Sequence, residues 1–560
     1  MAKHILEGKF MIYYYGQGYM GPLESLIAAL IYFLKLRGMD VISLGLPPLI
    51  FFVSFLMVNF HLLKRLFGLE VSFVANLLLS LPPPELSVLG VTAMGGYMET
   101  LFFGSLTLLG LVHYLESKGR WRILFLTGLA AGIGYWTSNL ILMYFIAIGV
   151  FWLLGTPFWR KLRESLGWRR VFLLQDMGIP PLLRWLAVAV HFVIVGFILW
   201  HAFSFFTGET FSFGKLKIEM ASPPFHVKKV KKILLLFIGE FVTLSLVKLG
   251  IRKCWNAIRP ALPLFGGFFL GAAPVFLYSL LGGEGYRLIH GSGAVLATEF
   301  PRQLQAVVWR DFVGGVWGVP IHSLEQEVGL ESIAAWTVLI ISLGLLFYFG
   351  LCHKKDLRKL WGFRASKYPY SIFPVILALV TVAICLFINL RAGRYLLATY
   401  FSVSLIFALA LAQMRRKLGF LSVLFLVILL ANQGYANFHY FHEIPNRDRV
   451  KRGHEAILRL LEERGIRGRY AHYVTNYILT FESQERIIVA PYRSHDRYPT
   501  YTKYVEGLDR VAYLFEETDS FVGSFQKALD DNRISYEKTW IEPYWVFVID
   551  RSKRSEKGIV

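Results

Sequence analysis

The feature that most constrains this chain is a series of long apolar runs that divides its first 434 residues. Each run is long enough, or nearly so, to cross the roughly 30 Å of hydrocarbon in a bilayer. The runs cover residues 41–60, 71–89, 96–115, 122–136, 138–155, 184–206, 233–250, 260–281, 334–352, 370–389, 394–413 and 418–434. Because a helix satisfies its own backbone hydrogen bonds in lipid, the pattern predicts an all-α polytopic membrane domain of about 12 spans over residues 41–434.

The composition agrees with a membrane protein and excludes a soluble globular domain. Charged residues make up 17% of the chain, whereas soluble domains carry about 25%. The net charge of +21 lies mostly in short loops between apolar runs, so the positive-inside rule explains it and no nucleic-acid partner is expected. The three cysteines (Cys254, Cys352 and Cys385) are scattered and form no disulfide or metal-ligand pattern.

The basic clusters fall on alternate connections and predict which side of the membrane each connection faces. They lie at 62–68, 116–122, 159–170, 251–259, 353–367 and 414–417, which we assign to the cytoplasm. The external connections are then 82–96, 207–232, 282–331, 389–394 and everything after about residue 433. One basic stretch, 226–232, falls on the external side and argues against this scheme.

The two ends of the chain differ from the membrane domain. Residues 435–560 have interspersed charges, helical spacing of apolar residues and three short apolar runs typical of buried strands, so they predict a small external α/β domain. Residues 1–40 carry Gln17, Tyr19 and Glu24 before the first long run. We expect this part to be an external loop with a juxtamembrane helix that frames a cleft, although an interfacial aromatic belt without a binding role explains it equally well.

Three further places carry polar residues at the external ends of spans or in a long external loop. In "GGYMET" (95–100), Tyr97 and Glu99 follow two glycines, so Glu99 either caps a helix or lines a hydrated cleft. Arg391 and Arg394 begin the run at 394–413 and suit phosphate oxygens, or else snorkel to the interface. The loop at 284–322 contains His290, which could contact an anionic ligand, although a lone histidine is more often structural.

Four motifs together resemble the C-type membrane glycosyltransferases, the superfamily of dolichyl-phosphate-mannose protein mannosyltransferases and aminoarabinose transferases. They are "IYYYGQGYMGPLE" (12–24), "GGYMETLFFGSLTLLGLVHYL" (95–115), "GLAAGIGYWTSNLIL" (128–142) and "GRYLLATYFSVSLIFALAL" (393–411). The resemblance implies a multi-pass cell-membrane enzyme that moves a sugar from a polyprenyl-phosphate carrier to a lipid, glycan or protein acceptor on the external face. Membrane lipid is then a further partner.

The resemblance also implies roles for particular residues. Glu99 lies where relatives carry an acidic residue in the second external loop, and Arg391 and Arg394 match an arginine-containing region, although this chain has Ala398 where that region has proline. Relatives carry a further acidic residue, often Asp-Glu, after a first span and just before the segment equivalent to residues 1–9. We therefore expect a first span and this acid to precede Met1, which would give about 13 spans; an inactive paralogue is the alternative.

Other functions and a metal stay open at this point. Two separated carboxylates could hold a divalent cation, but no cofactor is required. A polysaccharide or lipid transporter is one alternative function, although charged residues deep in the spans and repeat symmetry are not evident. A non-catalytic membrane protein that binds glycolipid through the same cleft is the other.

Overall fold

We describe the fold from a computed structural model of the 560-residue chain. It describes residues 1–155, 212–213, 216–217, 259–280, 300–319, 330–361, 370–387, 390, 392–442, 447–492 and 496–553, except for positions 35, 37, 39 and 118. His290, Arg391 and the predicted spans at 184–206 and 233–250 lie outside these residues.

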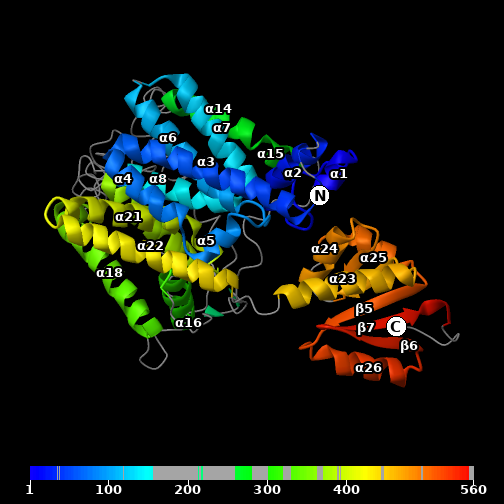
Figure 1. The fold of residues 1–560 in the computed structure, drawn as a ribbon. Coiled ribbons are helices and arrows are strands. Elements are labelled where there is room, and N and C mark those ends of the chain that lie inside the picture. The colour runs from blue at the N-terminus through cyan, green and yellow to red at the C-terminus, as the bar shows by residue number, and fades with distance from the viewer. Residues whose placement is uncertain are drawn as a thin grey trace.

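Six helices in the described part of the chain are long and apolar enough to cross a membrane. They are α3 (Val41–Phe67), α6 (Tyr97–Glu116), α18 (Leu330–Cys352), α20 (Phe373–Phe387, which η6 extends back to Tyr370), α21 (Leu397–Arg415) and α22 (Gly419–His442), most of which are labelled in Figure 1. Each begins or ends close to a predicted run, so the prediction of a multi-pass, mostly helical membrane domain is confirmed. The total of about 12 spans stays a prediction.

Other predicted runs form shorter helices. The run at 71–89 is divided by three prolines into α4 (Leu69–Ser80) and α5 (Pro84–Leu89), because proline lacks the N–H that would continue the helix. The runs at 122–136, 138–155 and 260–281 form α7 (Trp121–Thr137), α8 (Leu142–Gly155), α14 (Leu262–Gly271) and α15 (Ala273–Leu280). The expected juxtamembrane helix is α2 (Leu23–Phe33).

The remaining elements outside the C-terminal domain are short. They are α1 (Ala2–Leu6), η1 (Asn139–Ile141), β1 (Ser212–Phe213), β2 (Leu216–Lys217), η3 (Arg259–Ala261), α16 (Phe300–Leu304), the π-helical η5 (Gln305–Val316), α19 (Lys354–Trp361), η6 (Tyr370–Ile372) and η7 (Gly393–Leu396).

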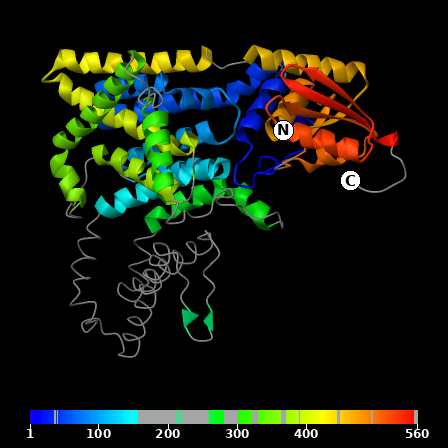
Figure 2. The ribbon, with the colours of Figure 1, turned by 90° about the horizontal axis from the view of Figure 1, so that it is seen from below.

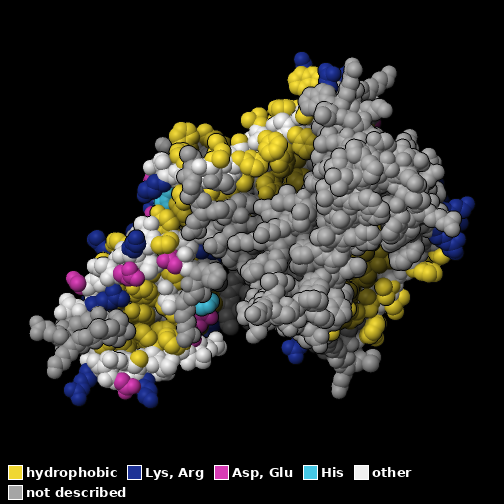
Figure 3. All heavy atoms as spheres, turned by 180° about the vertical axis from the view of Figure 1, so that it is seen from behind, with side chains coloured by type: hydrophobic (Ala, Val, Ile, Leu, Met, Phe, Trp, Pro, Cys, Tyr) yellow, Lys and Arg dark blue, Asp and Glu magenta, His cyan; other side chains and the backbone are white. Residues whose placement is uncertain are grey.

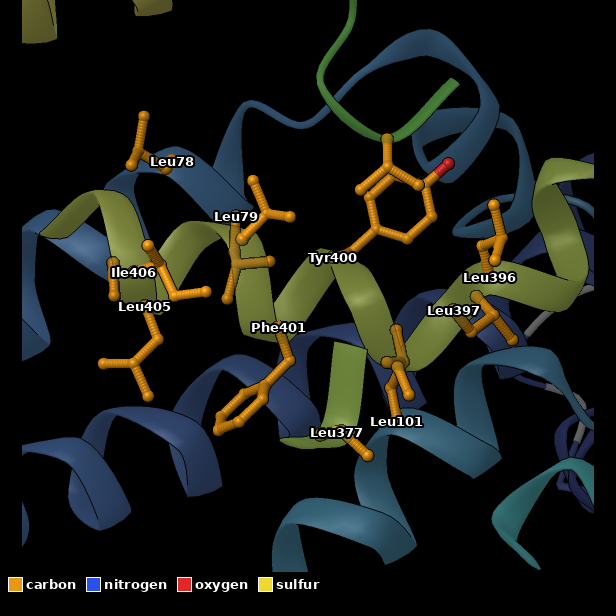
Figure 4. Packing of buried hydrophobic residues seen from close by; sticks show 14 of the residues in the cluster. Leu78, Leu79, Leu101, Leu377, Leu396, Leu397, Tyr400, Phe401, Leu405 and Ile406 are labelled. Carbon is orange, nitrogen blue, oxygen red and sulfur yellow. The ribbon is translucent and has the colours of Figure 1, made fainter. Parts of the chain in front are cut away.

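Helix α21 forms the centre of the membrane domain. It buries 16 of its 19 residues, and its side chains meet neighbouring helices in several directions. Figure 4 shows Tyr400, Phe401 and Leu405 leaving α21 on different sides, with Leu79 and Leu101 among the side chains around them. A helix that is apolar on every side is stable only when other elements surround it, so α21 fixes the frame on which the rest of this domain is placed.

Helices α7 and α14 approach each other through two pairs of glycines. A Cβ on Gly128 or Gly132 would lie 2.0 Å from the Leu264 carbonyl oxygen or 2.2 Å from that of Phe268. In α14, a Cβ on Gly267 or Gly271 would likewise come within 2.0 or 2.4 Å of an α7 carbonyl oxygen. Both helices therefore carry the small-xxx-small pattern that lets helix backbones touch in a membrane.

The membrane domain has two distinct ends. At one end Arg65 at the end of α3 pairs with Glu116 at the end of α6 (3.1 Å), and Arg415 at the end of α21 pairs with Glu70 in α4 (3.1 Å). Three predicted cytoplasmic clusters (62–68, 116–122 and 414–417) meet here, and we call it the basic end. The opposite end contains the starts of α3, α6 and α21, and we call it the site end.

The C-terminal domain is a five-stranded sheet with helices on both faces. Its elements are α23 (Arg447–Glu463), β3 (Gly468–Ala471), α24 (Tyr473–Glu482), β4 (Ile488–Pro491), α25 (Pro499–Glu506), β5 (Arg510–Glu516), α26 (Phe521–Asp531), β6 (Tyr536–Ile541), β7 (Tyr544–Asp550) and η8 (Arg551–Lys553). The strand order is β4-β3-β5-β7-β6, with β4, β3 and β5 parallel and β7 antiparallel to both neighbours. The predicted α/β domain is confirmed.

The surface of this domain differs from that of the membrane domain. Figure 3 shows Lys, Arg, Asp and Glu side chains gathered on the C-terminal domain, and hydrophobic side chains on much of the described surface elsewhere.

The interior of the C-terminal domain contains a buried arginine. Arg469 has no exposed surface, and burial lowers its pKa to about 9. Tyr544 and Glu482, which lie within electrostatic reach of Arg469, also hold His454 by hydrogen bonds of 2.9 and 3.1 Å.

The glycine contact between α7 and α14 gives a test of the membrane core. We expect Gly132→Ala to destabilise the protein by about 1–3 kcal/mol, because the added methyl group must separate the two helices. Gly344→Ala is the matched control, since Gly344 is also a glycine in a candidate span but has open space around its Cβ position. Thermal unfolding of the purified protein in detergent measures both, and equal melting temperatures would contradict the close contact.

Candidate functional site

The opening segment, residues 9–22, folds onto the site ends of α6 and α7. The Tyr14 N–H donates to the Met20 carbonyl (2.9 Å), and Met20 pairs with Ser138 just beyond α7. The Gly21 N–H donates to the last carbonyls of α7, and the Trp136 indole N–H donates to the Ile12 carbonyl (2.9 Å). These bonds satisfy helix-end groups that have no partner within the helix, so the segment is an integral part of the membrane domain.

Two glycines make this contact possible. Gly95 and Gly96 have φ angles of +76° and +73°, in the left-handed region that side chains other than glycine rarely adopt. A Cβ on Gly95 would lie 2.6 Å from the Tyr14 ring, and one on Gly96 would lie 2.9 Å from the Ser138 side chain. The "GGYMET" motif therefore serves close packing of the opening segment.

Glu24 and Glu99 form a buried carboxyl pair beneath the opening segment. Glu24 is 2% exposed and accepts a hydrogen bond from the Gly95 N–H (2.9 Å), and Glu99 has no exposed surface. The pKa of Glu24 is raised well above its ordinary value, first by burial and then by the charge of Glu99. Burial and the adjacent carboxyl therefore both favour the protonated form of Glu24.

The structure therefore brings Glu24 and Glu99 together but separates them from solvent. The predicted catalytic role of Glu99 stays a prediction, and the geometry is that of a buried structural pair. Tyr97, at the first position of α6, is 8% exposed and lies within electrostatic reach of Tyr19 and Arg394. Tyr97 is therefore buried as well, and Tyr19 and Arg394 are partly buried.

Arg394 lies at the start of α21, in the short helix η7. Its guanidinium carbon is 5.3 Å from the centre of the Tyr395 ring, and its Nε is buried with no hydrogen-bond partner among the described residues. The rest of the side chain is half-buried and lies within electrostatic reach of Tyr97 and Glu85. Arginine in such a setting can bind an oxyanion through its remaining N–H groups.

Glu85 is the carboxylate that contacts this arginine, and the sequence analysis did not select it. It lies in α5, directly after the three prolines at 82–84, and accepts a hydrogen bond from the Arg394 backbone N–H. Gly393 must be glycine here, because a Cβ would lie 1.9 Å from the Glu85 Oε2. The available signal was an acidic residue in the predicted external connection 82–96.

The pKa of Glu85 is raised, mainly because the carboxyl is largely buried. The Arg394 N–H opposes this shift, whereas Asp311, in η5, adds to it through its negative charge. Asp311 is 5% exposed and bound by both Nε (2.7 Å) and Nη2 (3.2 Å) of Arg310. In the described part of the chain, no three His, Cys, Asp or Glu side chains gather in the way a metal site requires.

A hydrophobic pocket lies beside Glu85. Its cavity has a volume of about 30 Å³. Its lining comes from α4 and the prolines that follow, η5, α21 and α22, namely Leu78, Leu79, Pro82, Pro83, Val316, Trp317, Tyr400, Val403, Ser404, Phe407, Leu429 and Gln433. Tyr400, whose ring stands next to Leu79 in Figure 4, also lies within electrostatic reach of Glu85. An apolar pocket thus lies near the hydrogen bond from the Arg394 backbone N–H to Glu85.

Of the other predicted site residues, Gln17 lies against the C-terminal domain. Gln17 is 7% exposed and faces the guanidinium of Arg497 from the C-terminal domain. With its amide oxygen turned toward that group, Gln17 accepts from Nη2 at 2.7 Å. Sequence reasoning did not select Arg497, although it lies in the "DRYPTY" stretch (496–501). His290 and Arg391 lie outside the described residues.

Comparison with known proteins gives likenesses in structure. No protein-family model and no curated protein sequence matches the chain. The archaeal oligosaccharyltransferase AglB from Archaeoglobus fulgidus, solved with an inhibitory peptide and a dolichol-phosphate, is similar over 99% of this chain and 70% of that chain, with 13% identity and a TM-score of 0.44. ArnT from Cupriavidus metallidurans, solved with undecaprenyl phosphate, is similar over 98% of this chain and 91% of that chain, with 12% identity and a TM-score of 0.35.

A second structure of the Archaeoglobus fulgidus oligosaccharyltransferase, in the apo form, gives 12% identity and a TM-score of 0.41. It covers 90% of this chain, which spans 63% of that protein's length. These structural matches are to glycosyltransferases of the C-type fold, the superfamily that the sequence motifs resemble. The identities and TM-scores are too low to transfer any residue's role, so the roles below rest on this chain alone.

The contact between Gly95 and Tyr14 can be tested by one methyl group. We expect Gly95→Ala to destabilise the protein by about 2–4 kcal/mol, since it adds crowding against Tyr14 to the strain of a positive φ. Gly465→Ala is the control, because Gly465 has a φ of +65° but nothing near its Cβ position, so it carries the strain alone. Melting temperatures in detergent compare the two variants. An equal loss in both would show that the opening segment is not packed against Gly95.

Proposed function

We propose that this protein is a glycosyltransferase that moves a sugar from a polyprenyl-phosphate carrier to a lipid, glycan or protein acceptor. The observation that carries the proposal is the hydrogen bond from the Arg394 backbone N–H to the Glu85 carboxylate, which brings this carboxylate within electrostatic reach of the Arg394 guanidinium at the site end, near an apolar pocket. A base for the acceptor, a cation for the leaving phosphate and an apolar surface for the carrier are what this reaction requires.

The proposed reaction uses each group once. The acceptor hydroxyl oxygen attacks the anomeric carbon of the sugar, and its proton passes to the Glu85 carboxylate. The bond between the anomeric carbon and the phosphate oxygen breaks, and the electron pair leaves with the polyprenyl phosphate. Arg394 stabilises the charge that develops on that oxygen, because charge-assisted hydrogen bonds from a guanidinium match phosphate geometry.

The surroundings of Glu85 support its role as the base. A carboxylate with a raised pKa takes up a proton more readily than an ordinary one, which suits a general base. The raised pKa of Glu85 comes mainly from burial, while the Arg394 N–H keeps the ionised form accessible. Glu24 and Glu99 are more deeply buried, with 2% and 0% of their surface exposed, whereas Glu85 is only partly buried.

The apolar lining of the small pocket is the surface against which we propose that the carrier's apolar chain lies. This lining is mostly aliphatic and aromatic, and the pocket lies between α4, α21 and α22 within the membrane domain.

The site end lies opposite the basic end, where three clusters of Lys and Arg meet, so we assign the site to the external face by the positive-inside rule. An external C-terminal domain follows from the same assignment.

Substitution of the two central residues tests the proposal. We expect Glu85→Gln to lower transfer from polyprenyl-phosphate-linked sugars about 10²–10⁴-fold while carrier binding is retained, because only the base is lost. Arg394→Gln should weaken carrier binding about tenfold, because it removes charge-assisted hydrogen bonds to phosphate. Glu70→Gln is the control at the basic end. Transfer assays and binding in nanodiscs measure both effects.

If Glu85→Gln leaves every glycan product of the cell intact while Arg394→Gln and deletion of the gene do not, the protein binds glycolipid without catalysing transfer. Flux of carrier across vesicles without glycosyl transfer would instead indicate a transporter. Either result would overturn the proposed reaction.

The pH dependence gives an independent test of Glu85. The base must be ionised to accept a proton, so the rate should fall as pH drops through the pKa of Glu85. Because that pKa is raised by burial, the acid limb should lie at higher pH than an ordinary glutamate pKa of about 4.3 would give. The residual rate of Glu85→Gln should lack this limb, and an unchanged limb in that variant would assign it to another group.

A further inference from the structure

Arg469 is a completely buried cation inside the C-terminal domain. It lies in β3, in register with Val489 of β4 and Ala512 of β5. Its side chain has no exposed surface, and none of Nε, Nη1 and Nη2 has a hydrogen-bond partner in the described part of the chain. Since a buried charge is costly unless it is paired and hydrogen-bonded, this guanidinium requires an anion in the interior of the domain.

The side chain of Arg469 points to the face of the sheet that α23 and α24 cover. Successive residues of a strand point to opposite faces, and residues paired across neighbouring strands point to the same face. Its register partner Ala512 packs in one apolar cluster with Ile457 of α23 and Leu479 of α24. The next residue of β3, Tyr470, belongs to a different cluster. Arg469 is therefore enclosed between the sheet and these two helices.

Asn476 of α24 is a second buried polar group in this layer. It has no exposed surface, and its amide nitrogen and oxygen both lack a hydrogen-bond partner among the described residues. Asn476 lies three positions before Leu479, so the two side chains share the face of α24 that packs on the sheet. A guanidinium and an amide N–H, which are both hydrogen-bond donors, thus lie in the layer between β3 and α24.

Glu482, at the end of α24, does not satisfy this arginine. Its Oε2 lies 3.1 Å from His454 Nδ1, and 28% of its side chain is exposed. His454 Nε2 lies 2.9 Å from the Tyr544 hydroxyl, which completes a chain of three polar groups. The charge of Glu482 acts on Arg469 from a distance, but no hydrogen bond joins the two side chains.

We propose that the C-terminal domain binds a small monovalent anion of the chloride type at Arg469 and Asn476. The anion accepts hydrogen bonds from the guanidinium and from the amide N–H of Asn476, and it neutralises the charge of Arg469. Enclosure by a sheet and two helices favours a small ion over an organic phosphate, because a larger ligand would have to separate these packed layers. The proposal does not depend on the proposed transfer reaction.

The helix that carries Asn476 leads to the attachment between the two domains. Three residues after α24 ends, Glu485 accepts hydrogen bonds from Lys3 Nζ (2.5 Å) and from the Tyr501 hydroxyl (2.6 Å). It also lies 3.0 Å from His4 Nε2. In Figure 1 and Figure 2 the domain lies beside the N-terminal helices, at one end of the membrane domain. The anion therefore stabilises a helix on which this attachment depends.

Exchange of chloride for gluconate at constant ionic strength tests the site in the full chain in nanodiscs. We expect amide hydrogen exchange in β3, α23 and α24 of the natural protein to slow about tenfold when chloride reaches about ten times its dissociation constant. The reason is that a ligand bound only by the folded state stabilises that state by mass action. Exchange in α21 of the membrane domain is the internal control and should not respond to chloride.

Substitutions separate this site from a general effect of salt. Arg469→Met should abolish the response to chloride, and it is expected to fold because apolar residues of similar volume often replace buried charges without loss of stability. Asn476→Leu should weaken the response, since it removes one donor. Arg486→Met is the control and should keep the full response, because Arg486 is an exposed arginine of the same domain that pairs with Glu462 (3.2 Å).

Bromide in place of chloride locates the ion directly through its anomalous X-ray scattering in crystals of the full chain. A bromide peak beside the Arg469 guanidinium supports the proposal, whereas ordered water alone at that position overturns it. The proposal also fails if chloride leaves the exchange of the natural protein unchanged, or if Arg469→Met responds to chloride as the natural protein does. If Arg469→Met does not fold, the chloride response of the natural protein and the position of bromide decide.

Discussion

The burial of α21 is the constraint on which the rest of the membrane domain depends. A helix with 16 of 19 residues buried cannot rotate or slide without displacing every helix around it. Its first turn continues from η7, so the same packing that fixes α21 also fixes Gly393 and Arg394 at the site end. Glu85 approaches this turn through the space that Gly393 leaves open. Core packing and the carboxylate–arginine contact are therefore consequences of one arrangement.

Much of this architecture could be predicted from the sequence, because hydrophobicity is a local property. Six described spans match predicted runs, and three apolar runs in the C-terminal part became β4, β5 and β7. The division of the run at 71–89 was not predicted, although the three prolines were visible. The glycine pairs in "GLAAG" (128–132) and "GFFLG" (267–271) were also present, but only the fold shows that they face each other.

The candidate site was harder to predict because it depends on contacts between distant parts of the chain. Arg394 was selected from its residue type at the start of a span, and the structure places it at the site end. Glu99 was selected by the same reasoning, yet its neighbours are Glu24 and the opening segment, which separate it from solvent. Glu85 and Arg497 were not selected. No nearby feature of the sequence indicates that Glu85 lies near an arginine, or that Arg497 lies against a glutamine. Residue type and position near a span end do not determine exposure.

The glutamates at the site end show how surroundings determine what one residue type can do. Glu24 and Glu99 lie together in the interior, where burial and the neighbouring charge favour the protonated form of Glu24, so the pair suits packing. Glu485 lies among Lys3, His4 and Tyr501, which favour its ionised form, so it suits an ionic attachment between domains. Glu85 lies between these limits, with a pKa raised by burial and an N–H donor from Arg394 that stabilises the anion. Of these four glutamates, only Glu85 combines a raised pKa with a cationic neighbour near a pocket. Acid–base chemistry on a phosphate-linked substrate requires this combination.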